Sequence, residues 1–525
     1  MHATFLALLT VCAASGSCEA PNVAQDAAAF ALAYGYPLLA FEKFARPQIQ
    51  TSGVNQIRHA RALSTAANTS VVTPNVDTLY STAILDLSHD AVSIEPGKKI
   101  TQGQESFDIP SDQFVLFSFY DPFGDNFANA GTGHPNNGKS WVVRQKPANV
   151  SSYGIQSSGQ GQYFVNSPSA YTILLIRWLV NATNLDLVHT LQDQILVTNT
   201  SQAAGNQYPW LSSIQGVDKS KSPAANVLDL LAQYAPASNP TIASDTDTVR
   251  QKLRAAGVLS GNTTSVTLQS GVNIDKANQT ALAAATSATL HATESVGNGW
   301  GTIQLNKTGN FGTDYNLRAS IAAAGYLMLT APDAIYPTWR NASDKSNSSS
   351  NIILSQGEAL LYTFSAKPPL AQTGFWSLTL YNSDNFLVAN ERNAYGVGDR
   401  SNLTYADGTL VYGNASPSGE QKQFQVLIQP ASVAPPTNWT ANWLPAPEAG
   451  LGFHVVLRWY GAEGKLLSGG YEYPRVTRVE AVTKQTNGTN GGGSRSGAGT
   501  SGADRLSMNS LSLLLGIALF LAYRL

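Results

Sequence analysis

The chain has 525 residues and a formal net charge of −2, and only 13% of its residues are charged. An average soluble domain carries about 25% charged residues, so uncharged polar residues must supply most of the polarity. This composition excludes a charge-rich coiled coil and a highly charged disordered chain. It also excludes the basic surface that nucleic-acid binding requires.

Residues 1–20 have the pattern of a secretory signal peptide, and the alternative is a buried N-terminal helix. The apolar run from Phe5 to Ala14 is too short to span a bilayer, and small residues follow it. Both cysteines, Cys12 and Cys18, lie in this segment. We therefore expect a secreted mature protein without an internal disulfide, a cysteine nucleophile or a thiolate metal site.

Residues 21–210 mix helical and strand patterns, which predicts a first module of the α+β class. An Ala-rich segment at 24–44 carries aromatic residues at helical spacing, and residues 184–197 read as an amphipathic helix. Predicted strands occupy apolar or β-branched segments at 79–87, 114–120, 141–144 and 172–180.

Residues 211–335 change to a period of 3.6, which predicts a helical connecting section. Asp275 is the expected N-cap of the long Ala-rich helix in this section, and Gly297–Gly301 reads as a loop. The predicted helices cover 225–234, 246–256, 274–296 and 316–329.

Residues 336–482 are dominated by strand patterns separated by turn residues, which predicts an antiparallel sandwich or a jelly-roll-like sheet. The predicted strands cover 359–365, 375–381, 424–428, 453–459 and 476–481. The fold class expected for the whole chain is α+β, with two β-rich modules joined by a helical middle section.

The C-terminal segment has the pattern of a glycolipid (GPI) anchor signal, and the alternative is a transmembrane helix. A Gly/Ser-rich tether covers 483–503, and a polar spacer and an apolar tail cover 504–525. The apolar tail is too short for a hydrocarbon core of ~30 Å, and small residues surround Ser501, the expected attachment site. We expect a protein anchored at the outer face of the cell membrane or in the cell wall.

Sequons for N-glycosylation agree with an extracellular location, because the modification requires an exposed asparagine in a secreted protein. The candidate asparagines are Asn68, Asn149, Asn181, Asn199, Asn262, Asn278, Asn306, Asn341, Asn347, Asn402, Asn414, Asn438 and Asn487.

The first candidate site is formed by Asn75, Asp77 and Tyr80, which follow Pro74 at the entrance of a predicted strand. These groups could bind a hydroxyl-rich ligand or a hard cation, and Asp77 could act as a general base. The alternative is that Asn75 and Asp77 only stabilise the local turn.

The second candidate site contains Asp121, Asp125 and Asn126, which follow a predicted buried strand. Carboxylate and amide oxygens at this spacing could bind a divalent cation, and Asp121 could act as an acid or base. The alternative is again a turn, which begins at Asp121 and Pro122.

In the second module, Trp376, Asn382, Arg392 and Arg475 are candidate ligand-binding residues. Tryptophan can stack on a sugar, and arginine can hold a carboxylate or phosphate. Core packing is the alternative for Trp376. Arg318, in the helical section, could pair with an acid between the modules.

No standard catalytic or metal-binding motif occurs, and the histidines lack the spacing of zinc ligands. We expect His134 to lie in a rim loop at the surface.

Several longer motifs resemble two known families. The motifs TPNVDTLYS at 73–81 and FYDPFGDNF at 119–127, followed by RWLV at 177–180, resemble the domain of unknown function 1254. The C-terminal half resembles the domain of unknown function 1214 through segments at 374–382, 390–392, 442–447 and 470–476. The resemblance covers about residues 25–480 and implies two β-rich modules, but it implies no mechanism. The anchor signal is typical of a fungal-type surface glycoprotein.

Three functions remain open from the sequence. The first is an extracellular hydrolase on a small polar substrate, with Asp77 or Asp121 as acid, base or metal ligand and Arg392 or Arg475 as an anion clamp. The second is a non-catalytic surface protein that binds cell-wall glycan or another ligand. The third is a structural surface glycoprotein.

Overall fold

The computed structural model describes residues 23–67, 73–96, 99–101, 104–106, 109–135, 140–158, 162–181, 183–203, 208–259, 266–339, 352–413 and 422–483. The predicted signal peptide, most of the tether, the anchor signal and Ser501 lie outside these ranges, as do Asn68, Asn262, Asn341, Asn347, Asn414 and Asn487. None of the helices in the described ranges combines the length and the apolar character that a membrane crossing requires. The predicted α+β class is confirmed, with β-rich modules on either side of a helical section.

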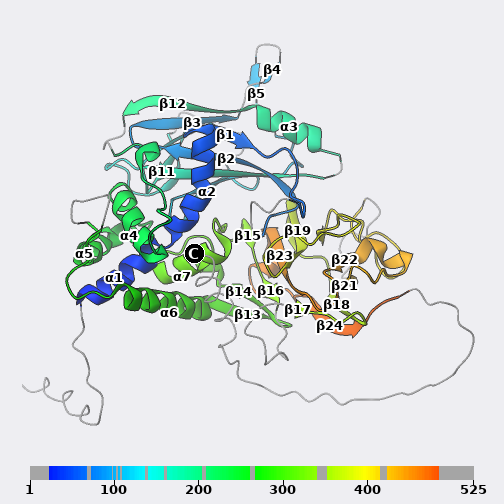
Figure 1. Cartoon of the computed structure of the whole chain (residues 1–525). Coiled ribbons are helices and arrows are strands. Elements are labelled where there is room, and N and C mark those ends of the chain that lie inside the picture. Colours follow the sequence, from blue (N-terminus) through cyan, green and yellow to red (C-terminus); the bar gives the residue numbers. More distant parts are fainter. Residues whose placement is uncertain are drawn as a thin grey trace, which may run out of the picture.

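The N-terminal module is a sandwich of two five-stranded sheets within the described residues (Figure 1). The first sheet has the order β1 (Ile57–His59), β2 (Thr78–Asp86), β11 (Tyr171–Leu179), β6 (Val115–Tyr120) and β7 (Asn126–Gly131). The second has the order β12 (Ile195–Ala203), β3 (Asp90–Pro96), β8 (Trp141–Gln145), β10 (Tyr163–Ser167) and β9 (Gly154–Ser157). A short hairpin of β4 (Lys99–Thr101) and β5 (Gln104–Ser106) stands apart from both.

The core between these sheets is built from the inward-facing residues of both. Phe117 lies at its centre, with its ring centroid 4.9 Å from that of Trp141 and 5.9 Å from that of Trp178. Side chains alternate along a strand, so the first sheet also has a face that points away from this core. A second layer of the protein covers that face.

That second layer consists of helices. The N-terminal helix α1 packs against four helices of the middle section. The helical layer therefore combines segments that are far apart in the sequence (Figure 1). The helices of the layer are α1 (Val23–Gly35), α2 (Pro37–Ser52), α4 (Pro223–Tyr234), α5 (Thr246–Ala255), α6 (Ile274–Ala292) and α7 (Tyr315–Gly325). Helix α3 (Leu185–Asp193) lies apart from them, beside the sandwich.

The C-terminal module is a second sandwich, with an eight-stranded and a four-stranded sheet within the described residues. The larger sheet has the order β13 (Thr293–Gly297), β14 (Trp300–Ile303), β16 (Thr338–Trp339), β23 (Gly452–Ala462), β19 (Leu370–Asn382) and β20 (Gly396–Gly398), and β15 (Ala334–Ile335) and β17 (Ile352–Ile353) also pair with β23. The smaller sheet has the order β22 (Trp443–Ala446), β21 (Phe424–Pro430), β18 (Glu358–Phe364) and β24 (Arg475–Glu480). Aromatic residues such as Trp376 and Trp459 fill the core between them.

Three predicted helices were too long at their C-terminal ends, and one of them, predicted over 316–329, ends at Gly325. The helix predicted over 274–296 ends at Ala292, because Thr293–Gly297 pairs with β14 as a hairpin. The helix predicted over 184–197 ends at Asp193, because Ile195 begins β12. Thr, Ile and Val favour strands when a partner is available.

The predicted N-cap of α6 was also wrong by two residues. The side chain of Asn273, not that of Asp275, accepts the hydrogen bond of 2.9 Å from the main-chain N–H of Lys276. Asn has an extended backbone at this position, as an N-cap requires.

Candidate anion-binding site at the module junction

Each β-rich module carries an Arg–Trp pair in a buried strand of its sandwich. In β11 the pair is Arg177 and Trp178, and in β23 it is Arg458 and Trp459. Because neighbouring side chains point to opposite faces of a sheet, the tryptophans fill the two cores and the arginines point outward. Both arginines are only 5% exposed, because the faces that carry them are covered at the junction of the modules.

Arg177 is held by neutral oxygens. Its Nη1 donates to Ser118 Oγ at 3.2 Å and to the Tyr120 hydroxyl at 3.3 Å. Its Nη2 donates to the main-chain carbonyl oxygen of Leu327 at 3.3 Å, which follows α7. The guanidinium therefore joins the first sheet to the segment that leads into the C-terminal module.

Arg458 makes the corresponding contacts from the other side. Its Nη2 donates to the Tyr381 hydroxyl at 2.9 Å and to the main-chain carbonyl oxygen of Thr73 at 3.3 Å, and its Nη1 donates to Thr379 Oγ1 at 3.2 Å. Thr73 belongs to the N-terminal module, so this arginine also crosses the junction.

Neither guanidinium has an acidic partner in the described part of the chain, where no carboxylate lies within 4.0 Å of Arg177 or Arg458. Burying a cation without a paired anion is costly, because water that would solvate it is removed. Two such cations at one junction therefore indicate a place that favours an anion.

Tyrosine side chains surround both cations. Burial raises the pKa of Tyr336 to about 12, although Arg177 and Arg458 both act to lower it. Burial likewise raises the pKa of Tyr460, against the same two arginines. Both guanidinium groups thus act on the same phenols, and these phenols stay neutral and available as hydrogen-bond donors.

The predicted residues Asn75 and Asp77 lie at this junction. Asn75 Nδ2 donates to the Tyr460 hydroxyl at 2.8 Å, and Asp77 forms an ion pair with Arg400. Tyr80, the third predicted residue, places its ring 5.9 Å from the Arg177 guanidinium. The first candidate cluster therefore meets residues of the second module that the sequence had not connected with it.

Among the described residues, three polar atoms at this boundary are buried without a hydrogen-bond partner. They are Asp77 Oδ2, Thr78 Oγ1 and Ser377 Oγ. Ser377 is the direct cross-strand neighbour of Arg458, so both side chains share one face of the sheet. Buried polar atoms are normally satisfied, and their grouping here is a second sign of a binding site.

The Asp121 cluster is separate and fully buried. Asp121 Oδ1 accepts hydrogen bonds from the main-chain N–H groups of Phe123 and Asp125, at 2.9 and 3.0 Å. Asp125 forms a buried ion pair of 2.9 Å with Arg318, so Arg318 does pair with an acid, and the pair joins the first module to the helical section. Burial first, and then the charge of Asp125, raises the pKa of Asp121 to about 8.

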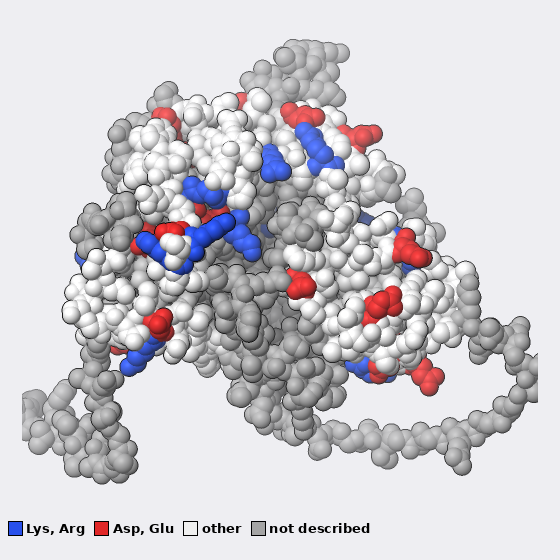
Figure 2. All heavy atoms as spheres, viewed as in Figure 1, with Lys and Arg blue, Asp and Glu red and all other residues white. Residues whose placement is uncertain are grey.

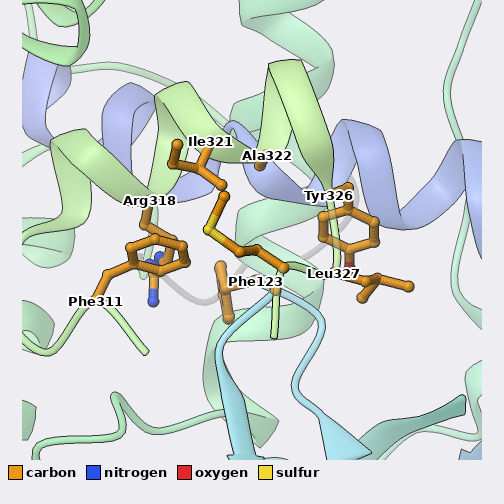
Figure 3. Close-up of a pocket in the computed structure, with 9 residues that line it drawn as sticks. Phe123, Phe311, Arg318, Ile321, Ala322, Tyr326 and Leu327 are labelled. Atoms are coloured by element: carbon orange, nitrogen blue, oxygen red, sulfur yellow. The ribbon is translucent and has the colours of Figure 1, made fainter. Parts of the chain in front are cut away.

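Aromatic rings enclose this cluster, and the predicted Asn126 acts beside it as a scaffold. Figure 3 shows Phe123, Phe311 and Tyr326 around a narrow pocket next to Arg318. Asn126 Nδ2 donates to two main-chain carbonyl oxygens, and its Oδ1 accepts from Thr330. No group of three or more acidic, His or Cys side chains in the described ranges has the arrangement of a metal site.

Trp376 and Asn382 have local roles. Trp376 is fully buried in the core of the C-terminal sandwich, and its indole N–H donates to the Tyr412 hydroxyl at 2.8 Å. Asn382 Oδ1 accepts from the main-chain N–H groups of Asp384 and Phe386 and so stabilises a turn. Neither side chain has a described contact with the arginines of the junction.

Arg392 and Arg475 are exposed. The guanidinium carbon of Arg392 lies 5.2 Å from the ring centroid of Trp443, and Arg475 begins the edge strand β24. No described contact connects either arginine with Asp77 or Asp121. Figure 2 shows that charged side chains of both signs are scattered among uncharged atoms on the face in view.

The sequence interpretation missed Arg177 and Arg458, although the sequence carries a signal for both. Each is a charged residue inside an otherwise apolar strand, in TILLIRWL and in VVLRWY, and each precedes a tryptophan. A charge in such a strand is costly unless it has a specific partner.

Two family models match the chain. Residues 54–199 match the model described as Protein of unknown function (DUF1254), and residues 342–464 match Protein of unknown function (DUF1214). The two families and their order are those predicted. Arg177 lies in the first matched segment and Arg458 in the second. No curated protein matches the chain.

One solved bacterial structure is similar in fold to this chain. The VPA0106 protein from Vibrio parahaemolyticus is similar with a TM-score of 0.56 and 16% identity, over 87% of this chain and 99% of that one. This likeness shows a shared fold alone. An uncharacterized protein from Burkholderia cenocepacia aligns with a TM-score of 0.38 and 13% identity, over 85% of this chain and 88% of that one.

Proposed function

We propose that this chain, which belongs to the family that pairs the DUF1254 and DUF1214 domains, binds a small organic carboxylate at the junction of its two modules. The observation that carries the proposal is the pair of buried guanidinium groups, Arg177 and Arg458, which have no carboxylate partner in the described part of the chain. Guanidinium and carboxylate form planar, two-pronged hydrogen bonds, so an organic acid is the ligand whose chemistry fits best.

The surrounding groups support a small and specific ligand. Neutral phenols of Tyr336 and Tyr460 supply donors and apolar ring surface. Ser377 supplies a buried hydroxyl that has no partner among the described residues. A long glycan needs an exposed aromatic strip instead, whereas Trp376 is fully buried. Binding at the junction is therefore favoured over glycan binding at the surface.

The predicted catalytic roles of Asp77 and Asp121 receive less support than the binding role. Asp77 is engaged by Arg400, and Asp121 is only 1% exposed. A hydrolase remains a prediction, and its catalytic groups need to be accessible to water.

The binding proposal is tested by thermal unfolding in sodium succinate, with sodium chloride of equal ionic strength as the reference. A ligand that binds only the folded state raises its stability by about 2.7 kcal/mol at a hundredfold excess over Kd. We expect succinate to raise Tm in the native chain.

Arg177→Lys and Arg458→Lys keep the charge but lose the planar fork, so both should lose most of this rise. Arg254→Lys, at an exposed position of α5, is the matched control. An equal rise in all four proteins, or none in the native chain, would overturn the proposal.

We also propose that the protein acts outside the cell as a glycoprotein held by a glycolipid anchor. The sequence patterns of the two terminal segments support this location. So does the exposure of six sequon asparagines, which are Asn149, Asn181, Asn199, Asn306, Asn402 and Asn438. Asn278 is half-buried and accepts a hydrogen bond from Tyr36.

The location is tested on intact cells that express the full chain. Phosphatidylinositol-specific phospholipase C should release the protein into the medium, and peptide N-glycosidase should lower its apparent mass. Retention in the cytosol at the mass of the unprocessed chain would contradict the proposed location.

A further inference from the structure

A histidine–aspartate pair lies beside the arginine site. His134 Nε2 is 2.8 Å from Asp333 Oδ1. His134 follows β7 in the N-terminal module, and Asp333 immediately precedes β15, which pairs with β23 of the C-terminal module. The pair therefore spans the same junction as Arg177 and Arg458.

Short contacts connect this pair with Arg177. Asn129 Nδ2 donates to Asp333 Oδ2 at 2.8 Å. Asn129 on β7 is the direct cross-strand partner of Ser118 on β6, and Ser118 Oγ accepts from Arg177 Nη1 at 3.2 Å. Cross-strand neighbours lie about 5 Å apart at their Cβ atoms, so Asp333, Asn129 and Ser118 link the histidine to the group that is proposed to hold the ligand.

The geometry suits a general base. A carboxylate of Asp333 accepts a hydrogen bond from Nε2–H, and this tautomer of the histidine keeps its lone pair on Nδ1. Nδ1 has no hydrogen-bond partner among the described residues, and the His134 side chain is 26% exposed, so water can reach it. Asn129 occupies the second oxygen of Asp333 and so fixes the orientation of the pair.

We propose that His134 is a general base that activates water for hydrolysis of an ester carried by the bound carboxylate, with Asp333 as its positioning residue. This inference rests on the proposed function, because the arginines hold the substrate. Nδ1 takes a proton from water as the water oxygen adds to the ester carbonyl. The tetrahedral intermediate then expels the alkoxide, which takes the proton from Nδ1, so the products are an acid and an alcohol. The step needs no oxidant or reductant.

The proposal is tested with two chromogenic esters, mono-4-nitrophenyl glutarate, which carries a carboxylate, and the neutral 4-nitrophenyl butyrate. The native chain should hydrolyse the anionic ester with a kcat/KM at least tenfold above that for the neutral ester. His134→Ala should lower kcat about 100-fold with little change in KM, since general acid–base catalysis contributes typically 10²–10⁴-fold. Added imidazole should restore part of the rate to this variant, which a merely structural role would not allow.

Further variants distinguish a loss of the general base from a loss of substrate binding. Asp333→Asn should lower kcat without raising KM, whereas Arg458→Lys should raise KM. His291→Ala, at an exposed position of α6, is the control and should leave both constants unchanged.

Two results overturn the inference. The first is that His134→Ala hydrolyses the anionic ester as fast as the native chain. The second is that the native chain hydrolyses neither ester although succinate still raises its Tm. The second result leaves the proposed binding function standing, whereas loss of the succinate effect would remove both.

Discussion

The guanidinium of Arg458 donates a hydrogen bond of 3.3 Å to the main-chain carbonyl oxygen of Thr73, which lies 385 residues earlier in the chain. The Tyr381 hydroxyl donates to the carbonyl oxygen of the next residue, Pro74, at 2.7 Å. Residues 73–77 therefore lie directly against the outer face of the large C-terminal sheet. The proposed ligand site depends on this contact between the two modules.

Loss of the Asn75–Tyr460 hydrogen bond should weaken this junction. Tyr460→Phe removes the acceptor and leaves buried Asn75 unsatisfied, so we expect a loss of about 1–3 kcal/mol in the free energy of unfolding. Urea unfolding of Tyr460→Phe, Asn75→Ala and the double variant measures the coupling. Tyr395→Phe, at a tyrosine whose hydroxyl donates to the exposed residue Asn393, serves as control. A coupling energy near zero would contradict a direct contact.

The buried Arg318–Asp125 pair should be far more important for stability than an ion pair at the surface. Arg318→Met leaves the charge of Asp125 buried and unpaired, which costs about 3–5 kcal/mol. Arg61→Met breaks the exposed pair with Asp193 and should cost less than about 1 kcal/mol. Chemical unfolding of both variants measures the two losses in the free energy of unfolding. Equal losses would rule out a special role for the buried pair.

Asp121 should make the protein less stable as pH rises. Its pKa is about 8 in the folded chain, because burial and the charge of Asp125 disfavour ionisation. Between about pH 4 and pH 8 the unfolded chain releases this proton while the folded chain retains it, so the free energy of unfolding falls with increasing pH in that window.

The comparison of Asp121→Asn with the native chain measures this effect. The amide cannot ionise, so the decline of Tm between pH 5 and pH 8 should become shallower. The exposed residue Asp112 offers a control, since Asp112→Asn should keep the native slope. An unchanged slope in Asp121→Asn would mean that Asp121 does not hold the proton.

The cap of helix α6 offers a test of local structure. Asn273→Ala removes the side-chain acceptor of the Lys276 N–H group and should cost about 1 kcal/mol. Asp275→Ala removes only a favourable charge near the N-terminus of the helix, so its effect should be smaller. Thermal unfolding of the two variants gives the order, and the reverse order would favour Asp275 as the cap.

Much of the fold could be predicted because strand and helix patterns are local. The apolar run at 172–180 predicts β11 and the Ala-rich run after Asn273 predicts α6. The end of α6 could not be predicted, because Thr293–Gly297 becomes a strand only through its pairing with β14. Tertiary pairing overrides local propensity in such short segments.

The site was predictable only in part. Asn75, Asp77 and Tyr80 stood out as polar residues after a turn, and they do lie at the junction. Tyr460, the partner of Asn75, and Arg458, the partner of Thr73, come from a strand almost four hundred positions later. Nothing local to either segment predicts that approach. The buried arginine inside each apolar strand was the signal in the sequence that could have connected the two segments.

A crystal structure of the chain with bound succinate tests the proposed binding site most directly. We expect a carboxylate within hydrogen-bond distance of both Arg177 and Arg458, between the two modules. A structure in which succinate occupies a different place, or in which neither arginine contacts it, would contradict carboxylate binding at the junction.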